Sequence, residues 1–229
     1  MSPREGLFIL GSVFLTTLVS VGTYRSNRLL RELGALPFNP LLAPAENGLK
    51  LVLLALLILL GRLSGLSPRS FGLVPITFDD VVLGLLAGVI GWATGNLVAG
   101  LAVARWGRGI VSSLVIRAIV PRARQEWPAV AIAMALSVLL EEVLFRSILL
   151  GGLGHWIPPV IIVPVAGIVF GLLHSIQGKL GVIVASALGI GLSLLFLWRG
   201  SIWPPLVAHY VINMCQVVLA SHKPEVLDA

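Results

Sequence analysis

Two adjacent acids, Glu141 and Glu142, lie in an otherwise apolar run from Ala129 to Gly152 whose only other charge is Arg146. A carboxylate at the centre of a bilayer costs at least about 2.5 kcal/mol on insertion scales, so charges kept at that depth usually serve a function. Two acids together in one such run therefore indicate a functional site.

The spacing of these charges gives the two acids different expected tasks. Glu142 and Arg146 are four residues apart, which places them on one face of a helix, where they can form a buried ion pair. Neighbouring residues on a helix diverge by about 100°, so we expect Glu141 and Glu142 to face different partners. A purely structural ion pair would explain Glu142 and Arg146, but it would leave Glu141 an unpaired buried acid.

Three further polar residues occur in later apolar runs and could complete a site around Glu141. His174 is near the end of one run, while His209 and Asn213 lie four residues apart on another and share a helix face. The rise of about 1.5 Å per residue puts Glu141 and His209 at similar depths, with His174 nearer the cytoplasmic side. We expect these side chains to converge on one inward-opening cavity.

The composition defines the elements that must position these residues. The chain has 229 residues, of which 57% are hydrophobic and 11% charged, and its mean hydropathy is +1.01. These values are typical of an integral membrane protein, in which an apolar stretch of about 20 residues spans the bilayer as a helix. Backbone groups in lipid must be satisfied internally, so the fold class is an all-α, polytopic transmembrane bundle of about seven spans. The expected spans are Gly6 to Tyr24, Leu49 to Ser64, Val81 to Ala104, Ala129 to Leu153, Val160 to Ser175, Leu180 to Trp198 and Ile202 to Ser221.

A basic stretch between Arg105 and Trp127 separates the third and fourth of these spans. Its apolar core, Ile110 to Val120, is too short to cross a membrane and is interrupted by Arg117. We expect an interfacial helix that anchors on anionic headgroups; a gate or a substrate-guiding element is the alternative.

Small residues at four-residue spacing predict close approach of helix backbones. The three pairs are Gly84 with Gly88, Gly91 with Gly95, and Gly167 with Gly171.

The charge distribution indicates an orientation. The formal charge of +6 would suggest a nucleic-acid partner in a soluble protein, but here the positive-inside rule accounts for it, and no nucleic-acid partner is expected. With seven spans and the N-terminus outside, the cytoplasmic side carries eleven Lys and Arg residues and the outer side four. The eleven are Arg25, Arg28, Arg31, Lys50, Arg105, Arg108, Arg117, Arg122, Arg124, Lys179 and Lys223, and the four are Arg4, Arg62, Arg69 and Arg199. We therefore predict an outer N-terminus and a cytoplasmic C-terminus.

Three ordered patterns carry a family resemblance. They are Glu141-Glu142-x-x-x-Arg146, Phe170-x-x-x-His174 and His209-x-x-x-Asn213, each in an expected membrane helix. Together they resemble the motifs of the CPBP intramembrane protease family, which includes type II CAAX prenyl proteases and bacteriocin-immunity proteins. The resemblance covers about Trp127 to Ser221. It implies one membrane domain made of N-terminal helices and the basic segment (1–127), a catalytic four-helix core (128–221) and a cytoplasmic tail (222–229).

The resemblance implies an endopeptidase that acts on a membrane-associated peptide, for which a prenylated CAAX-type tail is one candidate. Chemically, Glu141 can act as general base towards a water with His174 nearby, while His209 and Asn213 donate hydrogen bonds to the oxyanion. Glu141, His174 and His209 could alternatively hold a catalytic zinc. The absence of an H-E-x-x-H pattern favours a metal-free mechanism with no cofactor.

Two other classes of function stay open. A non-catalytic scaffold or immunity factor could bind a peptide in the same cavity without cutting it. An ion- or proton-coupled transporter is also compatible with intramembrane charges, but transporters commonly contain inverted repeats. The first three spans hold no counterpart of the Glu141 region, which disfavours the transporter.

Overall fold

Helices alone make up the regular structure of the part of the chain that the computed structural model describes, residues 2–34 and 36–222. The expected all-α class is therefore confirmed, while the predicted tail 222–229 lies outside the described residues except for His222. The α-helices are α1 (Pro3–Leu33), α2 (Pro44–Leu63), α3 (Phe78–Trp106), α4 (Leu114–Ile119), α5 (Trp127–Glu142), α6 (Pro159–Leu173), α7 (Gly178–Arg199) and α8 (Trp203–His222). Short 3-10 turns are η1 (Pro40–Leu42), η2 (Pro68–Phe71), η3 (Arg108–Ile110), η4 (Arg124–Glu126) and η6 (Ser175–Gln177).

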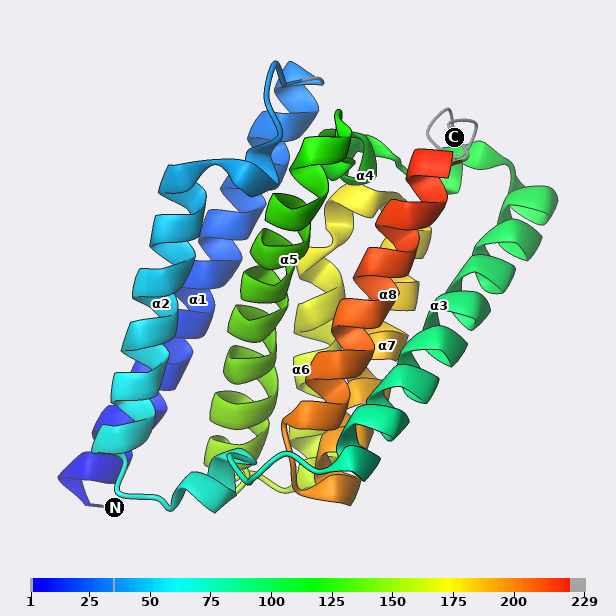
Figure 1. Cartoon of the computed structure of the whole chain (residues 1–229). Coiled ribbons are helices and arrows are strands. Elements are labelled where there is room, and N and C mark those ends of the chain that lie inside the picture. Colours follow the sequence, from blue (N-terminus) through cyan, green and yellow to red (C-terminus); the bar gives the residue numbers. More distant parts are fainter. Residues whose placement is uncertain (1, 35, 223–229) are drawn as a thin grey trace.

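The long helices form a bundle in which successive members run in opposite directions (Figure 1). Helix α1 begins at the lower end of the view and α8 finishes at the upper end, where the short α4 also lies. The start of α1 and the end of α8 are thus at opposite ends of the bundle, as an odd number of crossings requires.

The long helices coincide with the seven expected spans, but not all of them meet the requirements for crossing a bilayer. Five segments of the described chain are long and apolar enough: Pro3–Leu33, Pro44–Leu63, Phe78–Trp106, Arg124–Gly152 and Ser175–Arg199. Helix α6 is apolar but has only 15 residues, and the 20-residue α8 carries several polar residues. The protein is an integral membrane protein, whereas the count of seven spans and the orientation of the termini stay predictions.

The expected helix in the basic stretch is present but short. Helix α4 has six residues, Leu114–Ile119, and η3 precedes it. The Ser112 amide donates to the carbonyl of Gln177 at 2.9 Å, which attaches this stretch to the turn between α6 and α7. Its proposed contact with lipid headgroups stays a prediction.

Close helix packing occurs at two of the three expected glycine pairs, whereas at the third a Cβ added at Gly95 would be in ordinary contact, 3.5 Å from Cγ1 of Val184. A Cβ added at Gly84 would lie 2.6 Å from Cβ of Val207, and one at Gly88 would lie 2.7 Å from Cβ of Val211. Only glycine therefore lets α3 approach α8 this closely. Gly167 has the same role between α6 and α7, where an added Cβ would lie 3.2 Å from the backbone nitrogen of Ile190.

A buried ion pair closes the lower end of α3. Thr77 and Asp80 cap the helix reciprocally, each backbone nitrogen donating at 3.2 Å to the other's side chain. Asp80 also accepts a hydrogen bond from the Arg199 guanidinium at 3.1 Å, although it is almost fully buried. This pair ties the start of α3 to the end of α7, and it was not predicted from the sequence.

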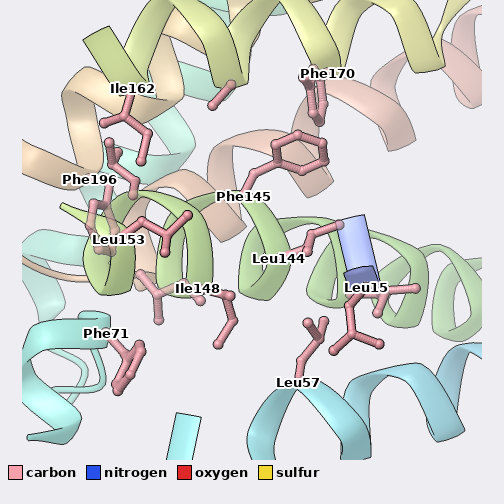
Figure 2. Close-up of a cluster of buried hydrophobic side chains, with 14 of the residues drawn as sticks. Leu15, Leu57, Phe71, Leu144, Phe145, Ile148, Leu153, Ile162, Phe170 and Phe196 are labelled. Atoms are coloured by element: carbon pink, nitrogen blue, oxygen red, sulfur yellow. The ribbon is translucent and has the colours of Figure 1, made fainter. Parts of the chain in front are cut away.

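Directly after the two acids, α5 widens into a π-helix, η5 (Val143–Gly152). The widened segment packs on η2: Ser147 donates to the carbonyl of Phe71 at 2.7 Å, and a Cβ on Gly151 would lie 3.2 Å from Cα of Phe71. Figure 2 shows this segment in the centre of the apolar core, with Leu144, Phe145 and Ile148 pointing to different neighbouring helices. Wide turns of this kind are rare and occur frequently at functional sites.

Candidate active site

The expected ion pair of Glu142 and Arg146 is present at the junction of α5 and η5. Nη1 of Arg146 lies 2.7 Å from Oε1 of Glu142, and the Glu142 side chain is 0% exposed. Nη2 of Arg146 donates to the carbonyl of Gly189 on α7 at 3.0 Å. The pair therefore also fixes α5 against α7.

Two phenylalanine rings surround this guanidinium. Its Cζ lies 5.0 Å from the ring centroid of Phe170 on α6 and 6.0 Å from that of Phe145. The two rings meet edge to face, 5.2 Å apart, as Figure 2 shows. Cation–π attraction strengthens where the charge is desolvated, so the rings compensate part of the cost of burying Arg146.

His209 lies between the two glutamates. Its Nδ1 is 2.8 Å from Oε1 of Glu142, and its Nε2 is 3.8 Å from Oε2 of Glu141. The expectation that the two acids face different partners is therefore wrong. The two ring nitrogens lie on opposite sides of the imidazole, so one ring meets carboxylates that diverge around the helix.

The two acids nevertheless differ in their surroundings, as expected. Glu142 is closed off by Arg146 and His209, whereas the Glu141 side chain is 31% exposed. Oε2 of Glu141 is itself buried and, like Oε2 of Glu142, has no hydrogen-bond partner; its 3.8 Å separation from Nε2 of His209 is too long for a hydrogen bond. Glu141 is therefore the acid that stays available to another molecule.

His174 lies just past the end of α6 and does not contact Glu141. Its Nδ1 is 2.8 Å from the carbonyl oxygen of Phe170, and its ring stacks on Phe170 with centroids 4.7 Å apart. Phe170 in turn meets His209 edge to face at 5.5 Å. His174 is thus connected to the Glu141–His209 pair through an aromatic ring.

Asn213 lies one turn beyond His209 on α8. Its Nδ2 approaches Sδ of Met134 on α5 at 3.7 Å, a weak contact that leaves most of its hydrogen-bonding capacity unused. The expected set is therefore gathered between α5, α6 and α8, with Asn213 and His174 next to the centre rather than in contact with Glu141.

The arrangement does not form a metal centre as it stands. The described residues contain no group of three or more His, Cys, Asp or Glu side chains that could hold one ion, so Glu141, His174 and His209 do not gather as a ligand set. Nδ1 of His209 is also occupied by Glu142. The choice between the metal-free and zinc mechanisms stays a prediction.

Sequence reasoning missed one charged residue beside the site. Lys50 was expected at the start of the span Leu49 to Ser64 and was counted only as a cytoplasmic-side charge; in the structure it lies inside α2, where its side chain is 13% exposed. Its Nζ is 2.9 Å from Oγ of Ser137, four residues before Glu141. A lysine at the edge of an apolar run was the signal in the sequence, and hydropathy does not show that its side chain reaches α5.

Comparison with known families agrees with the motifs. Residues 123–215 match a family model described as Rce1-like, type II CAAX prenyl endopeptidase. All six expected site residues lie inside this segment, which confirms the resemblance there. No curated protein and no solved structure matches the chain at a significant level.

Proposed function

We propose that this protein is an intramembrane endopeptidase that hydrolyses a peptide bond of a membrane-associated substrate with a water activated by Glu141. The observation that carries the proposal is the placement of His209 between a closed acid, Glu142, and an available acid, Glu141. The family match over residues 123–215 supports a protease.

In this mechanism Glu141 is the general base. A water that donates a hydrogen bond to Oε2 of Glu141 would also lie beside Nε2 of His209, because these two atoms are 3.8 Å apart. The carboxylate takes a proton from the water as oxygen attacks the peptide carbonyl, and it then delivers that proton to the leaving nitrogen. No nucleophilic side chain is required.

His209 is the proposed oxyanion donor, and its contact with Glu142 orients the ring for that role. In the imidazolium form that the proposal requires, Nδ1–H donates to Glu142 and Nε2–H donates to the oxygen of the tetrahedral intermediate. A charged donor placed where negative charge develops is a strong form of catalysis.

Asn213 and His174 have supporting roles in the proposal. The Asn213 amide lies one turn from His209 on the same face of α8, where a change of side-chain rotamer would direct it to the oxyanion. His174 is held by Phe170, so we assign it a second contact to the bound peptide beside the Glu141–His209 pair.

The substrate class follows from the location of the site and from the family. Glu141 and Glu142 lie in the segment Arg124–Gly152, which is long and apolar enough to cross a membrane, so a peptide must reach them from the lipid or from the membrane surface. We propose a peptide anchored near its C-terminus, with a prenylated CAAX-type tail as the first candidate to test.

The test is peptide cleavage by the purified protein in vesicles, with a farnesylated CAAX-type peptide as probe. The Glu141→Gln variant should lose about 10²- to 10⁴-fold in kcat, the range for removal of a general base, and should still bind the peptide. A different outcome would indicate a non-catalytic scaffold: the unsubstituted protein does not cleave the peptide, and the Glu141→Gln variant keeps both peptide binding and the cellular function.

A further inference from the structure

A lysine side chain that is only slightly exposed contacts α5 one helical turn before Glu141. Nζ of Lys50 on α2 lies 2.8 Å from Oε1 of Glu46 and 2.9 Å from Oγ of Ser137 on α5. Its side chain is 13% exposed, inside a helix long and apolar enough to span a membrane. A cation at such a position is a functional candidate by default.

Helix geometry places this cation and Asn213 at the same level along the bundle axis, towards one end of the site. Ser137 precedes Glu141 by four residues, so it shares a face with Glu141 and lies about 6 Å away along α5. Helices α5 and α8 run in opposite directions (Figure 1), and Asn213 follows His209 by four residues. Ser137 therefore lies above Glu141, and Asn213 lies above His209, both nearer the upper end of the bundle, where α4 lies.

The present partner of Lys50 is easy to replace. Glu46 is four residues away on the same helix, and its side chain is 41% exposed, so the pair is weak. Glu46 also lines a cavity of about 170 Å³ between α1, η1, α2 and α4, which offers its side chain room to turn away. The Glu46 carboxylate thus occupies the position at Lys50 that an incoming carboxylate would take.

We propose that Lys50 binds the C-terminal carboxylate of the peptide substrate and thereby sets the distance from that end to the bond that is cut. This proposal rests on the proposed protease function. An extended peptide advances about 3.3 Å per residue, so a separation of about 6 Å between Ser137 and Glu141 accommodates about two residues. The fragment released should therefore be about two or three residues long.

The experiment compares two farnesylated CAAX-type peptides in vesicles, one with a free C-terminal carboxylate and one with a C-terminal amide. The unsubstituted protein should show a kcat/KM about 10- to 100-fold higher for the acid, the fold-change that a charge-assisted hydrogen bond provides. In Lys50→Met the acid-to-amide ratio should fall to about 1. Mass spectrometry of the released fragment gives its length.

Ser137→Ala is the matched control, because it removes the contact of Lys50 with α5 and keeps the charge. It should retain the acid-to-amide preference. Equal cleavage of acid and amide by the unsubstituted protein, or an unchanged ratio in Lys50→Met, would overturn the proposal and leave Lys50 a link between α2 and α5. Failure to cleave either peptide would overturn the protease function itself.

Discussion

Removal of the Glu142 charge should destabilise the fold, whereas removal of the Glu141 charge should not. In Glu142→Gln, the fully buried Arg146 loses its hydrogen bond to an acid, and His209 loses its 2.8 Å contact with a charge. Removal of one partner of a buried pair costs about 3–5 kcal/mol, because the other charge stays buried and uncompensated. Glu141 makes no hydrogen bond through Oε2 and is 31% exposed, so Glu141→Gln should cost under about 1 kcal/mol.

Thermal unfolding of both variants in the same detergent measures this difference. For a chain of this size, 1 kcal/mol corresponds to about 2–4 °C in melting temperature, so Glu142→Gln should melt roughly 6–20 °C lower. Glu141→Gln should melt within about 4 °C of the unsubstituted protein. Both variants should lose peptide cleavage, which separates the acid that holds the site together from the acid that acts on water. Equal shifts in melting temperature for the two variants would refute this division of tasks.

Two further predictions concern helix packing and metal. Gly84→Ala should cost about 1–3 kcal/mol, measured by thermal unfolding, because its Cβ would lie 2.6 Å from Val207; Gly22→Ala, where nothing lies within 4 Å, is the control and should not destabilise. An equal loss in both variants would contradict the close packing of α3 on α8. Chelator treatment should leave the rate of peptide cleavage unchanged within about twofold, because proton transfer by a carboxylate needs no metal ion. Stoichiometric bound zinc, with activity that is lost when the zinc is removed and restored when it is returned, would refute the metal-free mechanism.

Much of the fold could be predicted because the bilayer imposes it. Apolar runs of about 20 residues can only form helices there, and the expected span Val81 to Ala104 lies within α3 (Phe78–Trp106). Two of the three glycine pairs likewise predicted close contact between helices, because only small residues permit it. The wide turn of η5 could not be predicted, since it depends on how Ser147 and Gly151 meet η2, which is distant in the sequence.

The sequence predicted which residues gather at the candidate site better than it predicted the contacts between them. Four-residue spacing correctly paired Glu142 with Arg146, because that contact lies within one helix. Contacts between helices depend on rotation and depth, which the sequence does not encode locally. For this reason His209 was not expected to meet both acids, His174 was expected closer to Glu141, and Lys50 was treated only as a cytoplasmic-side charge.

The shortness of α6 has a consequence for the lipid around the protein. A helix of 15 residues rises about 22 Å, whereas the hydrocarbon layer of a bilayer is about 30 Å thick. A bilayer that matches α6 must become thinner beside it, at an elastic cost of fractions of a kcal/mol per Å of mismatch. His174, at the end of α6, would then lie beneath a local depression of the membrane surface, where water reaches further towards the bilayer centre. The same mismatch would favour partition of the protein into thinner membranes over thicker, sterol-rich ones.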